Sequence, residues 1–148
     1  MNLFDAEVNF DEDVPPGYLA GDRRLAPELG GQQIAFNIFE LPPGQSLCPY
    51  HYEDGCEEWI IVLTGRLMLR TADGEQEMGP WDCAFCPAGE AGAHKTSNPL
   101  DEPCRLVIWS NSLDPAIAIY PDSNKVGIWP PDKLFRLSDA VLYFTDEP

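Results

Sequence analysis

The sequence predicts an all-β domain of short antiparallel strands. Fifteen prolines and twelve glycines are spread along the 148 residues, and the β-rich runs between them lack a helical period of useful length. Turn sequences such as "PPG", "ADG" and "PAGEAG" stand between these runs. Short strands separated at this spacing are typical of a β-sandwich or a β-barrel.

The apolar runs give the positions of the expected strands. In the run 58–64, the alternation of side chains along a strand places Glu58 on the same face as Ile60 and Val62, and the intervening residues on the other face. One segment, 133–144, has room for a turn or two of helix. The expected strands cover residues 34–41, 47–53, 58–64, 66–71, 83–86, 94–97, 105–110 and 116–120.

The length is that of a single domain, 1–148, with a core flanked by two extensions. Residues 1–33 form an acidic, turn-rich N-terminal extension, 34–120 form the core, and 121–148 form a C-terminal extension. The last segment is too apolar to leave in water, so we expect it to pack on the core or on a second subunit. Because symmetric dimers commonly bury such surfaces, a homodimer is expected.

Charge excludes several kinds of partner. The chain has 25 acidic and 9 basic residues and a formal charge of −16, so its field repels phosphate backbones and anionic membrane surfaces. We therefore expect no nucleic-acid partner and no membrane partner. The opening residues lack a basic start followed by an apolar core, and no stretch reaches the length of a membrane span. These features predict a cytoplasmic protein whose partner is a small-molecule substrate or ligand.

The five cysteines favour reduced thiols over a disulfide framework, because their number is odd and no secretory signal is present. Cys83 and Cys86 form a lone C-x-x-C pair. Residues three apart in a strand point to opposite faces, so their sulfurs are expected to diverge. Small buried apolar residues are the favoured interpretation of this pair.

Candidate metal ligands gather in two segments. His51 and Glu53 are two residues apart, which places them on one face of a strand, and Glu58 begins the next apolar run after a turn. A carboxylate pointing into a core needs a cation or hydrogen bonds. His94 is the other of the two histidines in the chain. Two imidazoles and one or two carboxylates can hold Fe(II), Mn, Ni or Zn with open positions.

The spacing of the first segment follows the pattern G-x5-H-x-H-x3-4-E-x6-G. Gly44, His51, Glu53, Glu58 and Gly65 occur in its order. The gap between the first glycine and the histidine is six residues instead of five, and a glutamate, Glu53, replaces the second histidine of the pattern.

The second segment follows the pattern G-(D)-x4-P-x-G-x2-H-x3-N, to which Asp82, Pro87, Gly89, His94 and Asn98 correspond. Four residues instead of two separate the glycine from the histidine, an extension that preserves strand parity. A tryptophan stands at position 81, where the pattern has a small turn glycine.

Together the two patterns, over about residues 34–110, resemble those of the cupins. The resemblance implies an antiparallel jelly-roll barrel, the double-stranded β-helix, with a divalent transition metal (Fe, Mn, Ni or Zn) held inside. It also implies that His51, Glu58 and His94 are ligands, with Glu53 as a fourth ligand or a catalytic general base. The glutamate in place of a histidine shifts the site towards harder cations.

Two classes of function stay open. One is a metal-dependent enzyme acting on a small oxygenated substrate, of the dioxygenase or the sugar isomerase or epimerase type. The alternative is a non-catalytic module that binds a metal or a small ligand, because cupin folds carry both. The sequence "YPDSNKVG", residues 120–127, clusters polar groups with a lysine that could meet an anionic substrate. An Asx-type turn explains the same residues, and no role is assigned to them.

Overall fold

The computed structural model describes residues 1–147 and is all-β, with its strands paired antiparallel in three sheets. The largest sheet has the order β1 (Asn9–Phe10), β2 (Gly21–Arg24), β3 (Ile34–Leu41), β10 (Cys104–Asn111), β5 (Glu58–Thr64), β8 (Cys83–Cys86). A second sheet has the order β13 (Lys133–Arg136), β12 (Lys125–Trp129), β11 (Ala116–Tyr120), β4 (Tyr52–Asp54), and a third the order β7 (Gly74–Met78), β6 (Leu67–Thr71), β9 (His94–Ser97). The helices are short: α1 (Leu25–Glu28) and the 3-10 turns η1 (Glu90–Gly92), η2 (Pro121–Ser123) and η3 (Leu137–Asp139).

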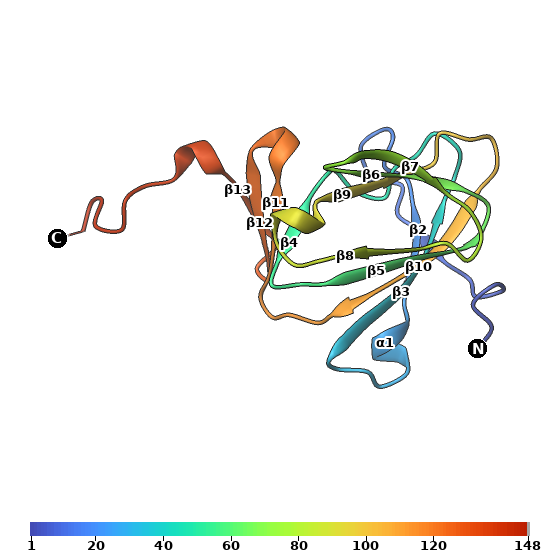
Figure 1. Ribbon diagram of the computed structural model, residues 1–148. Helices are drawn as coiled ribbons and strands as arrows, with labels where there is room; N and C mark the ends of the chain where they lie inside the picture. Colours follow the sequence, from blue (N-terminus) through green and yellow to red (C-terminus); the bar gives the residue numbers. More distant parts are fainter. Residues whose placement is uncertain (148) are drawn as a thin grey trace.

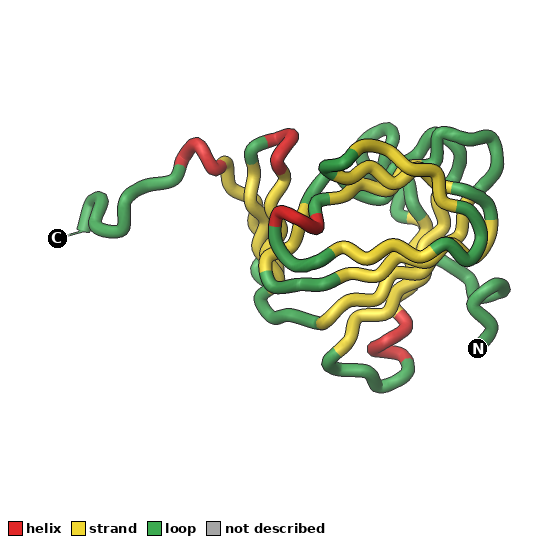
Figure 2. The backbone as a smooth tube through the Cα atoms, viewed as in Figure 1, coloured by secondary structure: helices red, strands yellow, loops and turns green. Residues whose placement is uncertain are grey.

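The largest and the three-stranded sheets form two layers (Figures 1 and 2). The main core lies between them, where Ile60 and Val62 of β5 pack in one buried cluster with Leu67 and Leu69 of β6. The predicted alternation of the run 58–64 is confirmed, because Leu63 and Ile61 belong to a separate cluster on the other face of the sheet.

The sheets do not close into the barrel expected from the sequence. The segment 42–51 joins β9 through two isolated bridges, Ser46 to Ser97 and His51 to His94, instead of a continuous strand. Its prolines at 42, 43 and 49 carry no backbone N–H and cannot donate to a ladder. The expected strand 47–53 is therefore reduced to the three residues of β4.

The N-terminal residues cover the outer face of the largest sheet. Leu25 of α1 and Ala6 are buried there against Ile38 of β3 and Val107 of β10. The guanidinium of Arg105 donates hydrogen bonds of 2.7 to 2.9 Å to three backbone carbonyl groups of residues 3–6. Residues 1–33 thus contribute two strands, β1 and β2, a helical turn and a second apolar cluster.

A row of aromatic rings crosses the uncovered part of this face. Phe36, Trp109, Trp59 and Phe85 are direct neighbours on β3, β10, β5 and β8. Successive ring centroids are 6.2, 6.4 and 4.6 Å apart. Trp59 and Phe85 are 39% and 45% exposed.

Five of the expected strands occur with the expected bounds: β3, β5, β8, β9 and β11. The strands that the sequence did not predict carry weak alternation; β7, for example, exposes four of its five residues. The segment 133–144 begins with β13, and its helical content is the single turn η3.

The C-terminal tail leaves the body on the side of β12 and β13 (Figure 1). Val141, Leu142, Tyr143 and Phe144 are 73% to 88% exposed. These four residues are not covered by the core of this chain, and the expectation that the extension packs on the core or on a second subunit stays a prediction. Within residues 1–147, no helix is long and apolar enough to span a membrane.

The five cysteines are free, and the Cys83–Cys86 pair behaves partly as expected. Cys83 is exposed whereas Cys86 is buried, as the strand parity predicts. The interpretation of both as buried apolar residues is thus wrong for Cys83.

Gly65 ends β5 at a position that only glycine can occupy without strain. Its φ is +72°, and a Cβ atom there would collide with the carbonyl oxygen of Pro103. Trp81, at the position where the cupin pattern has a glycine, also has a left-handed φ of 71°. The backbone of this turn thus keeps a glycine-like conformation even though the residue is a tryptophan.

The side chain of Asn98 joins three parts of the core, so its replacement should strongly reduce stability. It is fully buried, donates to the carbonyl oxygens of Leu41 (2.9 Å) and Glu102 (2.8 Å), and accepts from the N–H of Leu100 (3.1 Å). Asn98→Asp removes both donors and buries a carboxylate, so we expect the free energy of unfolding to fall by about 3 kcal/mol. Urea denaturation measures this loss. Asn9→Asp, at an exposed position of β1, is the matched control and should change stability little.

Candidate metal centre

Two histidines face each other at one end of the space between the layers. His51 and His94 exchange both backbone hydrogen bonds, with N···O distances of 3.0 and 2.8 Å. Residues paired in this way carry their side chains on the same face. The imidazole centroids are 4.9 Å apart, and both residues are buried, with exposures of 8% and 3%.

Glu58, the first residue of β5, brings a carboxylate to the same place. It pairs with Ser110 of β10 and Cys86 of β8, so the register of two neighbouring strands fixes it. Its Oε2 lies 3.3 Å from Nε2 of His94. One potential ligand atom from each of His51, Glu58 and His94 lies within 4.8 Å of the other two. The structure therefore brings together three of the four expected ligands.

Backbone carbonyl groups set the tautomers of both imidazoles. Nδ1 of His51 lies 3.1 Å from the oxygen of Pro49, and Nδ1 of His94 lies 2.9 Å from the oxygen of Gly92. A carbonyl oxygen only accepts hydrogen bonds, so each neutral ring carries its proton on Nδ1. The lone pair of each Nε2 is then free, which is the arrangement that metal-binding histidines commonly have.

Burial keeps the imidazoles neutral. It lowers the pKa of His51 to about 4, and the neighbouring His94 lowers it further in the same direction. The pKa of His94 is also lowered, mainly by burial. Both rings are thus available as neutral ligands at physiological pH.

The carboxylate of Glu58 is destabilised for the same reason. Burial, followed by repulsion from Glu53, raises its pKa to about 7. Its oxygen faces the lone pair of His94 Nε2 at a distance where two acceptors repel each other. A cation between these atoms removes the repulsion and compensates the charge of both glutamates. The two imidazoles and the carboxylate therefore fit a divalent transition metal.

Glu53 lies beside this group and is not part of it. It is half-buried on β4, where it pairs with Ala118 of β11. Its carboxylate is close enough to raise the pKa of Glu58 and of the Cys56 thiol. Its expected roles as a ligand or a general base stay predictions.

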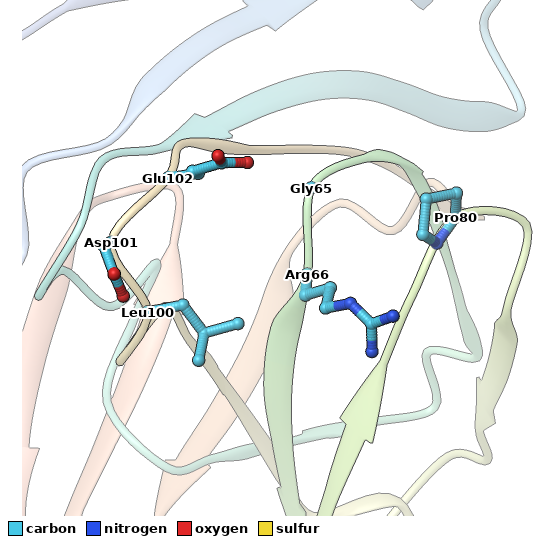
Figure 3. A pocket seen from close by; sticks show the side chains of 6 residues that line it. All are labelled: Gly65, Arg66, Pro80, Leu100, Asp101 and Glu102. Atoms are coloured by element: carbon cyan, nitrogen blue, oxygen red, sulfur yellow. The ribbon is translucent and has the colours of Figure 1, made fainter.

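The three donors line a cavity of about 270 Å³ with otherwise mostly apolar walls. Phe39, Leu47 and Ile108 contribute these walls, and Cys48 lies with its sulfur 3.5 Å from Nδ1 of His51. Another cavity, of about 450 Å³, is lined by six residues that Figure 3 shows, and it contains none of the three donors. The smaller cavity is thus the candidate active site.

Sequence reasoning missed two residues at this site. The ring of Tyr120, at the end of β11, stacks on His51 with a centroid distance of 5.8 Å. Cys48 is half-buried, and the pKa of its thiol is raised to about 12 by burial and by Glu58 and Glu53. Tyr120 was missed because it reaches His51 through the pairing of β11 with β4. The alternation of side chains along a strand predicts which face a residue lies on, but it does not predict which strands pair.

Comparison with known families decides the relationship. The model of the cupin domain matches residues 37–110, which is half of the chain. The protein belongs to the cupin family. No curated protein matches the sequence of this cupin.

Solved structures resemble this cupin over most of its length. A candidate sugar phosphate isomerase from Acidithiobacillus ferrooxidans has a TM-score of 0.83 and 21% identity, and the match covers 95% of this chain and 91% of that one. A sugar phosphate isomerase of the cupin superfamily from Silicibacter pomeroyi has a TM-score of 0.82 and 25% identity over 96% and 95% of the two chains. The polyketide cyclase RemF from Streptomyces resistomycificus has a TM-score of 0.62 and 26% identity over 78% and 81%.

The raised pKa of Glu58 predicts a pH-dependent difference between the metal-free wild type and Glu58→Gln. The pKa of Glu58 is about 7 in the folded protein and 4.5 in the unfolded chain. Between these pH values the unfolded chain has lost the proton that the folded protein still holds, so the free energy of unfolding of the wild type falls as the pH rises from 4.5 to 7. The amide does not titrate. Relative to the wild type, the variant should therefore gain up to about 3 kcal/mol of unfolding free energy between the two pH values.

Denaturation in EDTA at several pH values across this window measures the gain. Glu57→Gln is the matched control, because this neighbouring carboxylate is exposed, and its curve should run parallel to that of the wild type. A Glu58→Gln curve that also runs parallel to the wild type would show that burial does not destabilise the Glu58 carboxylate.

Proposed function

We propose that this cupin is a metal-dependent enzyme that acts on a small oxygenated substrate, of the sugar isomerase type. One observation carries the proposal: one potential ligand atom from each of His51, Glu58 and His94 lies within 4.8 Å of the other two, in a cavity of about 270 Å³. His51, Glu58 and His94 would hold Fe, Mn, Ni or Zn. When bound, the metal supplies Lewis-acid polarisation of substrate oxygens.

The isomerase type is supported by the comparison and by the extra carboxylate. The Silicibacter pomeroyi protein, similar over nearly the whole chain, is described as a sugar phosphate isomerase. Interconversion of an aldose and a ketose moves a proton between adjacent carbons and needs no external oxidant. It requires a base beside the polarised carbonyl. Glu53, which lies next to the three donors, is our candidate for that base, and the dioxygenase type lacks comparable support.

The residues of this chain have separate roles in the proposed reaction. Glu53 takes a proton from the carbon beside the substrate carbonyl and returns it to the former carbonyl carbon, while the hydroxyl proton of the first carbon passes to the former carbonyl oxygen. Phe39, Leu47 and Ile108 limit the access of water to the cavity, which strengthens electrostatic interactions there. The carbonyl groups of Pro49 and Gly92 keep Nε2 of each histidine unprotonated.

Other features expected from the sequence stay predictions. The division into 1–33, 34–120 and 121–148, the cytoplasmic location and the homodimer belong to this group. The homodimer is supported by exposed apolar surface, namely the aromatic row at Trp59 and Phe85 and the tail at Val141 and Leu142.

Metal content tests the proposed centre. Protein purified without added metal or an affinity tag should contain about one equivalent of Fe, Mn, Ni or Zn by elemental analysis. His94→Ala should lose it, whereas Ser97→Ala in the same strand should retain it. Circular dichroism confirms that both variants fold. If the wild type contains no metal and takes up none from an excess of each cation, the enzyme proposal is wrong and a non-catalytic ligand-binding module remains.

Glu53→Gln separates a base from a ligand. If Glu53 is the base, the variant should keep its metal while exchange of substrate hydrogen for deuterium falls by at least about 100-fold, a typical contribution of general base catalysis. Proton NMR in D₂O with a panel of sugar phosphates measures this exchange. Asp54→Asn, at the exposed end of β4, is the matched control. Loss of metal in Glu53→Gln would instead make Glu53 a ligand.

A further inference from the structure

A further cavity, of about 550 Å³, adjoins the 270 Å³ cavity of the candidate metal centre. Leu47 and Cys48 line both cavities, so the two share a wall. The lining of the larger one includes Lys95 of β9, and Ser123 and Lys125 from the sequence "YPDSNKVG". This turn sequence, to which the proposed function assigns no role, therefore lies next to the proposed reaction centre.

The two lysines of this cavity are held over aromatic rings and lack acidic partners. The Nζ of Lys95 lies 5.5 Å from the ring centroid of Tyr18, and that of Lys125 lies 5.5 Å from that of Tyr120. Among residues 1–147, neither ammonium group has a carboxylate within ion-pair distance. Cation–π contacts orient an ammonium group without neutralising it.

The one acidic side chain that lines the cavity is already neutralised. Both oxygens of Asp122 accept hydrogen bonds from the guanidinium of Arg70, at 2.6 and 3.0 Å. The same guanidinium lies 4.1 Å from the ring centroid of Tyr50. The cavity thus retains the two positive charges of Lys95 and Lys125, in a chain whose formal charge is −16.

The backbone of the turn explains how Ser123 and Lys125 reach the cavity. Pro121 begins the 3-10 turn η2, and Asn124 takes a left-handed conformation with φ 51° and ψ 50°. Asparagine tolerates this conformation better than most residues. The chain reverses there and enters β12 at Lys125, directly opposite Tyr120 of β11.

Tyr120 connects this cavity to the metal centre. Its ring contacts both His51, at 5.8 Å between centroids, and the ammonium group of Lys125, at 5.5 Å from the centroid. Lys125 and His51 therefore contact the same aromatic ring, and the two cavities share the wall formed by Leu47 and Cys48. This arrangement suits a substrate with an anionic group at one end.

We propose that Lys95 and Lys125, with the hydroxyl of Ser123, bind the phosphate group of a small phosphorylated sugar. Two ammonium groups match a phosphate monoester, which carries a charge of about −2 at neutral pH and offers three acceptor oxygens. The placement of the sugar end at His51, Glu58 and His94 rests on the proposed function. The phosphate site itself stands on the cavity and its charges alone.

Binding of inorganic phosphate to metal-free protein tests the site directly. Isothermal titration calorimetry at low ionic strength compares the wild type with Lys95→Met, Lys125→Met and the double variant. Each single change should weaken binding at least about tenfold, because a hydrogen bond to a charged group is lost. Lys133→Met, at an exposed position of β13, is the matched control and should bind phosphate like the wild type.

The opposite results are equally clear. The proposal is overturned if the wild type does not bind phosphate, if neither lysine variant weakens binding, or if Lys133→Met weakens it as much. Acetate should bind at least about tenfold more weakly than phosphate, because it carries half the charge. Equal affinities would make the site a carboxylate site and would also overturn the proposal.

A second measurement separates this proposal from the proposed function. If Mn²⁺ occupies His51, Glu58 and His94, it should broaden the ³¹P resonance of phosphate bound at the lysines. The broadening should disappear in His94→Ala, whereas phosphate affinity should persist. Lysine-dependent phosphate binding in a protein that takes up no metal would support the phosphate site and contradict the metalloenzyme proposal.

Discussion

The pair of backbone hydrogen bonds between His51 and His94 is the constraint on which the candidate site depends. It forms where the segment 42–51, rich in proline, cannot continue a strand along β9. A reciprocal pair at this point is sufficient to align the two imidazoles on one face. Glu58 then needs no loop to position it, because the registers of β8 and β10 already fix the start of β5. Backbone pairing thus fixes the positions of the three residues whose side chains are the donors of the site.

Charge organises the site in two opposite ways. Partial burial of Glu58, the nearby carboxylate of Glu53 and the neutral imidazoles together disfavour negative charge at the metal centre, and a cation relieves this effect. The cavity lined by Lys95 and Lys125 instead favours negative charge, since neither lysine is in an ion pair. Of the nine basic residues in the chain, four arginines are occupied by ion pairs. The other five basic residues form no ion pair within residues 1–147, and of these only Lys95 and Lys125 line the cavity beside the donors. Long-range repulsion of anions elsewhere would direct an anionic substrate to these two lysines.

Much of this architecture can be predicted from the sequence, and the failures have physical reasons. Runs such as 34–41 and 58–64 were predicted with correct bounds because alternation of buried side chains is a local signal. The sheets stay open around residues 42–51 because the prolines of this segment lack backbone N–H groups. The effect of these prolines on strand pairing cannot be predicted until the partner strand, β9, is known. His51, Glu58 and His94 could be identified from motif spacing, whereas Tyr120 enters the site through the pairing of β11 with β4. Contacts between strands distant in sequence leave no such local signal.

The turn at residues 120–127 shows how one sequence can satisfy a structural and a functional requirement together. The turn itself is explained by local conformation, because Pro121 begins the 3-10 turn η2 and Asn124 is left-handed, while the carboxylate of Asp122 is bound by Arg70. Turn formation alone does not require a lysine after the left-handed residue, nor an ammonium group held over Tyr120. Tyr120 also stacks on His51, so the ring that holds Lys125 lies beside one of the three candidate donors. Tyr120 thus contacts one residue of each cavity, His51 and Lys125, while Leu47 and Cys48 form the wall that the two cavities share.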